Sequence, residues 1–223
     1  MSAVRRDLLD AIAAKIAAGA ARRVGVDGVD GAGKTIFADE LAVALRGFGR
    51  PAVRVSLDGF HNPRHVRYRR GRSSPEGFWL DSYDYASFRR HVLSPFEAGG
   101  SRRYRRAIRD VSTDRAVDSE VEHAPPEAVL VVDGIFLHRD ELSDCWDFSV
   151  FLAVPFEVTF ERMSQRDGCP LDPEDSDNRR YLRGQQIYLD ACAPESRADL
   201  VIDNTDPASP HVVSASVVPG RRW

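Results

Sequence analysis

The sequence predicts an α/β fold of three layers, in which helices cover both faces of a mainly parallel sheet. Two observations lead to this prediction: apolar runs rich in β-branched residues recur along the chain, and helical patterns separate several of them. The 223 residues are 43% hydrophobic and 29% charged, with a formal net charge of −3. This length suits a single domain, 1–223. The charge balance argues against a general polyanion-binding protein.

The chain begins with a predicted amphipathic helix. Leu8, Leu9, Ile12 and Ile16 recur at helical spacing, and the pattern ends near Gly19. Acidic residues and a lysine interrupt the apolar side, so the segment does not have the pattern of an export signal. No run approaches the ~18 consecutive apolar residues of a membrane span. We therefore expect a cytoplasmic protein that does not enter a membrane.

The predicted strands are continuous apolar runs, as buried parallel strands tend to be. They cover residues 22–27, 52–58, 128–134, 147–155 and 198–204. Helical patterns cover residues 33–46, about 84–93, 156–166 and 178–191. A long excursion, 59–126, separates the second and third strands, and we expect it to form a substrate site. The acidic, proline-broken segment 167–178 predicts a hinged helical lid at about 156–191.

Residues 28–35 match the pattern G-x-x-x-x-G-K-[ST] between a predicted strand and a predicted helix. Glycines there let backbone N–H groups curl around phosphates at the helix N-terminus. The sequence therefore predicts a P-loop NTPase fold that binds ATP. Lys34 would bridge the β- and γ-phosphates as a catalytic residue, and the Thr35 hydroxyl would bind Mg²⁺. The predicted ATP-binding residues of the loop are Gly28, Asp30, Gly31, Ala32, Gly33, Lys34, Thr35 and Ile36.

Two further carboxylates follow predicted strands, Asp58 after 52–57 and Asp133 after 128–132. Chemistry in open α/β sheets gathers at the carboxyl ends of the strands. Asp133 has the position of an acid that holds Mg²⁺, and Asp58 the position of a base that accepts a proton from an attacking hydroxyl. We also count Asp58 among the candidate metal ligands. The alternative for each is a simple cap of the turn that follows its strand.

Five segments together resemble the uridine kinase superfamily, which includes uridine–cytidine kinases, bacterial-type pantothenate kinases and phosphoribulokinases. They are "GVDGVDGAGKT", "LDGFHNP", "SYD", "VVDGIFL" and "RRYLRGQQIYLDACAPESRADLVIDNTD", and the resemblance covers roughly residues 20–205. It implies an ATP- and Mg²⁺-dependent kinase in which Asp58 is the catalytic aspartate. The implied substrate-binding residues are His61, Phe78, Asp84, Tyr104 and Arg109. Arg109 stands where uridine kinases carry a pyrimidine-reading histidine, and "DGFHNP" is closer to pantothenate kinases.

Nearly all positive charge in the chain is arginine. Arg162 and Arg166 lie four residues apart on one helical pattern, so they share a face. By the same resemblance, Arg166 and Arg180 correspond to lid residues that clamp the triphosphate. We expect Arg162, Arg166 and Arg180 to contact ATP, with Arg166 stabilising the transition state.

Two arginine clusters, 61–72 and 101–109, leave three interpretations open: RNA binding, a solvated loop, or a basic pocket for an anionic acceptor. No RNA-binding signature accompanies them, so nucleic acid is not the expected partner. Six histidines and three cysteines have no metal-ligand spacing, and the cysteines are expected to be reduced thiols.

The sequence therefore predicts an ATP-dependent kinase that phosphorylates a hydroxyl of a small molecule, with a uridine- or cytidine-like nucleoside as the leading acceptor. One alternative is a kinase for pantothenate or another non-nucleoside alcohol. A second is a regulatory protein that binds ATP without kinase activity. A homo-oligomer remains open.

Overall fold

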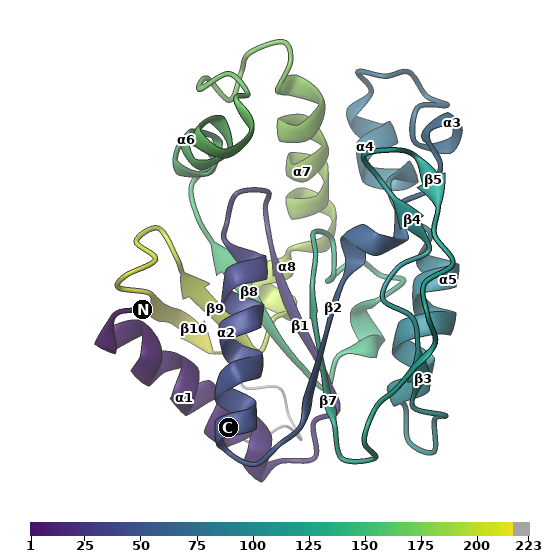
Figure 1. The fold of residues 1–223 in the computed structure, drawn as a ribbon. Helices are drawn as coiled ribbons and strands as arrows, with labels where there is room; N and C mark the ends of the chain where they lie inside the picture. Colours follow the sequence, from purple (N-terminus) through teal and green to yellow (C-terminus); the bar gives the residue numbers. More distant parts are fainter. Residues whose placement is uncertain (216–223) are drawn as a thin grey trace.

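A computed structural model describes residues 1–215 and contains a six-stranded sheet with helices on both faces (Figure 1). The strands are β1 Arg23–Gly28, β2 Ala52–Ser56, β7 Val129–Asp133, β8 Phe148–Ala153, β9 Leu200–Asp203 and β10 His211–Ala215. Their order in the sheet is β10-β9-β8-β1-β7-β2, and every neighbouring pair is parallel except β10 with β9. The mainly parallel α/β fold that the sequence predicts is confirmed.

Helices α1 Ala3–Ala18 and α2 Lys34–Gly47 pack together and cover one face of the sheet. The Ser2 hydroxyl caps α1 by accepting a hydrogen bond from the Arg5 N–H at 3.1 Å. The side chains that α1 and α2 bury against the strands are apolar and recur at helical spacing. They include Leu9, Ile12 and Ile16 of α1 and Phe37, Leu41 and Leu45 of α2.

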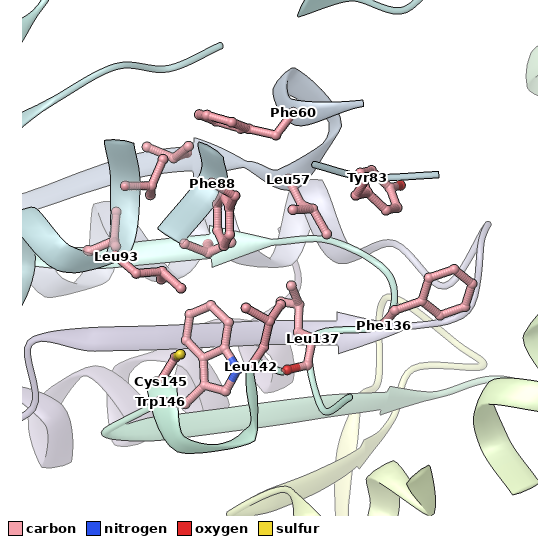
Figure 2. Close-up of a cluster of buried hydrophobic side chains, with 14 of the residues drawn as sticks. Leu57, Phe60, Tyr83, Phe88, Leu93, Phe136, Leu137, Leu142, Cys145 and Trp146 are labelled. Atoms are coloured by element: carbon pink, nitrogen blue, oxygen red, sulfur yellow. Dashed lines mark hydrogen bonds between the residues drawn. The ribbon is translucent and has the colours of Figure 1, made fainter. Parts of the chain in front are cut away.

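A second hydrophobic cluster fills the opposite face, where the sheet meets the excursion (Figure 2). Trp146 lies in this cluster and donates from Nε1 to the carbonyl oxygen of Leu137 at 2.8 Å. A Cβ on Gly25 of β1 would lie 2.9 Å from the Trp146 ring, so a glycine in the central strand makes room for the indole. Phe60 and Phe88 pack edge to face, with ring centroids 5.2 Å apart.

The excursion after β2 is mostly short helices and two small ribbons. It contains α3 Arg64–Arg67, α4 Pro75–Asp81, α5 Tyr85–Phe88, a π-helical turn Arg89–Leu93, β3 Arg103–Tyr104, β4 Arg109–Asp110, β5 Arg115–Ala116 and β6 Glu122–His123. Strand β3 pairs with β6, and β4 pairs with β5. Short 3-10 turns cover Leu57–Phe60, Ser94–Phe96 and Ser143–Cys145.

The lid region consists of α6 Phe156–Asp167 and α7 Arg179–Cys192, followed by α8 Pro194–Arg197 (Figure 1). Helix α7 packs closely on α4 of the excursion. At this contact a Cβ on Gly184 would lie 2.7 Å from the Phe78 ring, so glycine allows the two helices to approach. The lid and the excursion therefore face each other beside the carboxyl end of the sheet.

The predicted strands and the helices at 33–46, 156–166 and 178–191 are all present within a few residues. The prediction of one α-helix at about 84–93 is wrong. Only Tyr85–Phe88 is α-helical, and Arg89–Leu93 forms a π-helical turn. Pro95 follows in a 3-10 turn and has no N–H to continue a helix. Strand β10 was not predicted, since all its residues are exposed. The expected single domain, 1–223, extends beyond the described residues. Within residues 1–215, no helix is long and apolar enough to span a membrane.

Candidate active site

The loop 28–35 joins β1 to α2 at the carboxyl end of the sheet and forms a phosphate cradle. Gly31 and Gly33 have φ angles of 77° and 88°, a backbone region that favours glycine. A Cβ on Gly31 would also lie 2.5 Å from the carbonyl oxygen of Thr159 in α6. The first N–H groups of α2 have no carbonyl partner within the helix, so they are available to an anion. A cavity of ≈ 350 Å³ lies here, and its lining includes Asp30, Gly33, Lys34, Thr35, Ile36 and Asp133.

Three other predicted loop residues contact the loop itself or the protein around it. Gly28 ends β1, where a Cβ would lie 2.8 Å from the carbonyl oxygen of Leu152. Ala32 is buried, and its carbonyl oxygen accepts a hydrogen bond from Asn204 Nδ2 at 2.7 Å. Lys34 lies over the loop and donates from Nζ to the carbonyl oxygen of Val29 at 2.8 Å.

Thr35 and Asp133 meet at the base of the cradle. The Thr35 hydroxyl donates to Asp133 Oδ2 at 2.7 Å. Arg54 of β2 donates from Nη2 to the other carboxylate oxygen of Asp133 at 2.8 Å, and from Nε to Asp39 Oδ1 of α2 at 2.8 Å. Asp133 is 2% exposed, so two partners hold this buried carboxylate in one orientation.

These groups fit Mg²⁺·ATP. The loop provides N–H donors and a lysine for phosphate oxygens, while Thr35 and Asp133 provide two oxygen ligands of the kind that Mg²⁺ prefers. Over residues 1–215, no group of three or more His, Cys, Asp or Glu side chains is arranged to hold a metal. A bound Mg²⁺ would therefore take its remaining ligands from phosphate oxygens and water.

Asp58 lies just after β2, in the 3-10 turn Leu57–Phe60. Its Oδ1 accepts a hydrogen bond from the Tyr83 hydroxyl at 2.9 Å. Its carbonyl oxygen accepts one from His61 Nδ1 at 2.8 Å, and the His61 and Tyr83 rings lie 4.4 Å apart. Asp58 lines the cradle cavity and also a second, larger cavity. This carboxylate therefore faces both spaces.

The second cavity, of ≈ 590 Å³, lies between the excursion and the lid, and we call it the acceptor cavity. His61, Phe78 and Tyr83 line it from the excursion, and Asn178 and Tyr181 line it from the lid. It shares Asp30, Asp58 and Arg166 with the cradle cavity, so the two spaces adjoin. Of the predicted substrate-binding residues, His61 and Phe78 lie here.

Burial decides the protonation of the groups around Asp58. It lowers the pKa of His61, which is therefore neutral at pH 7. Burial, together with the nearby Asp58, raises the pKa of Tyr83 well above its usual range, so this hydroxyl stays a donor. Burial also raises the pKa of Asp30, while Lys34 acts in the opposite direction.

No family model and no curated protein sequence matches the chain, but solved structures do. A possible uridine kinase from Bacillus stearothermophilus has a TM-score of 0.70 and 24% identity, over 88% of this chain and 97% of that one. A putative fructose transport system kinase from Silicibacter sp. TM1040 has a TM-score of 0.61 and 26% identity, over 78% and 93%. D-glycerate 3-kinase from Cryptococcus neoformans var. grubii has a TM-score of 0.60 and 12% identity, over 95% and 98%. The fold is that of the P-loop kinases. The resemblance to P-loop kinases that the sequence predicts is therefore confirmed at the level of the fold.

In this P-loop kinase fold, two of the three predicted lid arginines border the cradle. Arg166 lines both cavities, and its guanidinium pairs with the Asp167 carboxylate, with Nη2 to Oδ2 at 2.6 Å. The Arg166 side chain is 67% exposed, so it is free to turn toward a bound phosphate. Arg162 lines the cradle but donates to the carbonyl oxygens of Gly31 at 3.2 Å and Thr205 at 2.8 Å. Its guanidinium therefore also holds the loop.

The third predicted lid arginine, Arg180, lies away from both cavities in this structure. Arg180 is 7% exposed and lines neither cavity. Its guanidinium donates to backbone carbonyl oxygens between α3 and α4, those of Arg67, Gly71, Arg72 and Ser74. Because its donors are already satisfied there, Arg180 fastens the lid helix to the excursion.

Three predicted substrate-binding residues also lie outside the acceptor cavity. Asp84 caps α5 by accepting a hydrogen bond from the Ser87 N–H at 2.9 Å. Tyr104 is buried and donates to Glu122 Oε2 at 2.7 Å. Arg109 donates to the carbonyl oxygen of Asp114 at 2.9 Å, across the β4–β5 turn. Each side chain is engaged by a local partner that the order of motifs in the sequence did not reveal.

Three residues that support the site were not predicted from the sequence. Tyr83 donates to Asp58, and Arg54 orients Asp133. Gln185 of α7 is buried and accepts a hydrogen bond from the Asp30 N–H at 2.6 Å, which ties the lid to the cradle. Tyr83 is the middle residue of the "SYD" segment and Gln185 lies within the last resembling segment, so both stand inside motifs that carry the resemblance. No motif in the sequence indicates that Arg54 contacts Asp133.

Proposed function

We propose that the protein is an ATP- and Mg²⁺-dependent kinase that transfers the γ-phosphoryl group to a hydroxyl of a small molecule. One observation carries this proposal: Asp58 stands between the cradle cavity and the acceptor cavity. A carboxylate at that junction can orient an acceptor hydroxyl and take its proton. The similar solved structures, described as a possible uridine kinase, a putative fructose transport system kinase and a D-glycerate 3-kinase, support the same reaction class.

In this reaction ATP supplies the phosphoryl group, and Mg²⁺ neutralises charge on its phosphates. Lys34 binds phosphate oxygens, and the loop N–H groups hold the triphosphate in place. Asp58, kept in one rotamer by the Tyr83 hydroxyl, accepts the proton of the attacking hydroxyl. Arg166 turns from Asp167 toward the transferred group and stabilises its charge. Closure of the lid excludes water and limits hydrolysis of ATP.

A uridine- or cytidine-like nucleoside is the first acceptor to test. The resembling motifs and the aromatic wall of the acceptor cavity favour it, because aromatic rings suit a flat base. With Tyr104 and Arg109 turned away, base recognition would depend on His61, Phe78 and Tyr181. The same displacement of the expected base-reading residues favours a non-nucleoside alcohol as the second candidate.

The direct test is ADP release with Mg²⁺·ATP across nucleosides, pantothenate, sugars and phosphorylated sugars. We expect at least one acceptor to accelerate ADP release in the wild-type protein and to fail in Asp58→Asn. ATP binding without stimulation by any acceptor would favour a regulatory ATP-binding protein instead. Stimulation by a nucleoside would identify the acceptor class that the motifs suggest.

A further inference from the structure

The acceptor cavity carries an excess of negative charge. Asp30, Asp58, Asp167 and Asp177 line it, against one cationic side chain in the lining, Arg166. Lys34 lies behind Asp30, with Nζ 4.0 Å from Asp30 Oδ1, and favours the charged form of that carboxyl, whose pKa burial raises. Even with Lys34 counted, the carboxylates outnumber the cations. That guanidinium is already paired with Asp167. His61 adds no positive charge, because burial lowers its pKa. A carboxylate or phosphate group on the acceptor would therefore be repelled here.

Three polar side chains of the cavity are left with acceptors only. His61 Nδ1 contacts a carbonyl oxygen, which can only accept, so Nδ1 carries the proton and Nε2 is left as an acceptor. Asn178 uses its amide hydrogens on the carbonyl oxygens of Pro170 and Asp172, both at 2.8 Å, which leaves Oδ1 as an acceptor. The Tyr83 hydroxyl donates its hydrogen to Asp58, so its oxygen is left as an acceptor. Arg166 and the Tyr181 hydroxyl can donate, but these acceptors and the carboxylates together favour a ligand that brings donors.

The arginine clusters do not reverse this balance, because none of their arginine side chains lines the acceptor cavity. Arg67 donates to the carbonyl oxygen of Asn62 and pairs with Asp114. Arg69 and Arg70 both pair with the buried Asp81. The interpretation of these clusters as a basic pocket for an anionic acceptor is thus not supported by their contacts.

We propose that the phosphate acceptor is a hydroxyl compound that also carries a basic amine and no acidic group, with Asp30 and Asp177 binding the amine. This inference rests on the proposed function, because it treats the larger cavity as the acceptor site. Phe78 and Tyr181, whose ring centroids lie 5.0 Å apart, line the same space and offer apolar surface for the carbon atoms beside an ammonium group. The volume of ≈ 590 Å³ accommodates a molecule of sugar size.

The transfer step leaves the amine unchanged. The acceptor hydroxyl oxygen attacks the γ-phosphorus, and a new O–P bond forms as the bond to the β-phosphate oxygen breaks. ADP leaves with that electron pair, and the hydroxyl proton passes to Asp58. The ammonium group keeps its protons throughout, so it serves recognition and is not phosphorylated.

The test compares two matched sets of probes. One set is glucosamine, glucose and glucuronate; the other is 3-amino-1,2-propanediol, glycerol and glycerate. Binding to the protein is measured by calorimetry with Mg²⁺ and a non-hydrolysable ATP analogue, and ADP release is measured with ATP. We expect the amine of at least one set to bind roughly tenfold more tightly than its neutral partner, and the acid more weakly than the neutral partner.

Binding of an acid as tight as that of its neutral partner, or no advantage for either amine, would overturn the inference. The proposed function fails separately: an amine that binds without accelerating ADP release contradicts kinase activity but not the charge preference. Conversely, fast ADP release with a neutral or acidic acceptor alone would keep the kinase and reject the amine.

Two variants locate the amine. Asp30→Asn and Asp177→Asn should each reduce the preference for the amine over its neutral partner by about fivefold. Asp177 is exposed on the lid, so its variant should fold even if a change in the cradle loop does not. Asp190→Asn is the matched control, since Asp190 is an exposed acid of α7 outside the cavity. Equal loss of preference in all three variants would contradict a local role for Asp30 and Asp177.

Discussion

The phosphate cradle and the acceptor cavity adjoin at Asp58 but are built in different ways. The cradle is one continuous loop between a strand and a helix, and it offers backbone N–H groups. The acceptor cavity takes its walls from the excursion and from the lid, which lie far apart in the sequence, and it offers side chains. A backbone site binds any phosphate of suitable size, whereas a side-chain site selects by charge and shape. The division explains how one fold serves many acceptors.

The largest effect should come from the residue at the junction. Asp58→Asn keeps the size of the side chain and still accepts from Tyr83, but it cannot take a proton. We expect kcat to fall by about 10³-fold, with ATP binding within about twofold of wild type. ADP release and calorimetric ATP titration measure the two quantities. An unchanged kcat would remove Asp58 from the reaction and break the link between the two sites.

A change confined to the cradle should affect ATP first. Lys34→Met removes the ammonium group that lies over the loop, and we expect kcat/KM for ATP to fall by about 10²-fold. The acceptor should still bind in the absence of nucleotide, because Lys34 does not line the acceptor cavity. Loss of acceptor binding in this variant would mean that the two sites are not separate.

A substitution in the lid at Arg180 should lower the stability of the protein and leave its affinity for ATP unchanged. Arg180→Ala leaves several backbone carbonyl oxygens of the excursion without a donor, and we expect the free energy of unfolding to fall by about 2 kcal/mol. KM for ATP should change by less than about twofold. Arg183→Ala is the control, since Arg183 lies on the same helix as Arg180 and forms an exposed ion pair with Glu174, which precedes the helix. Urea unfolding and steady-state kinetics separate the outcomes; a large rise in KM for ATP would restore Arg180 to the cradle.

Removal of the Tyr83 hydroxyl beside Asp58 should have a smaller effect on kcat than Asp58→Asn. Tyr83→Phe removes the hydrogen bond that holds the carboxylate, and we expect kcat to fall by about tenfold, the value of one hydrogen bond to a charged group. KM for ATP should stay close to wild type, since Tyr83 does not line the cradle cavity. A kcat equal to that of wild type would show that Asp58 needs no partner.

The smallest effect on catalysis is expected at Tyr104. Tyr104→Phe removes the bond to Glu122, at a cost of about 1 kcal/mol in the free energy of unfolding. KM for the acceptor should change by less than about twofold, because the side chain lies outside the acceptor cavity. A rise of tenfold or more in that KM would return Tyr104 to the acceptor site and require the excursion to move on binding.

The sequence by itself determined the parallel strands of the sheet, the cradle and the position of Asp58. A P-loop is encoded by consecutive residues, and Gly31 and Gly33 show the positive φ angles that the pattern implies. Asp58 and Asp133 could be placed because parallel strands bring their carboxyl ends to one edge of the sheet. These features depend on local backbone geometry and strand order, both of which leave a pattern in the chain.

Only the tertiary structure decided which side chains face the acceptor. Arg180, Asp84, Tyr104 and Arg109 occupy suggestive positions in the sequence, yet each has a partner elsewhere that satisfies it. Tyr83 was not expected, although it holds Asp58. The physical reason is that a polar group turns toward whichever partner lies within about 3 Å after the core has packed. That choice depends on the contacts of α4 with α7 and of the excursion with the sheet, which no local pattern records.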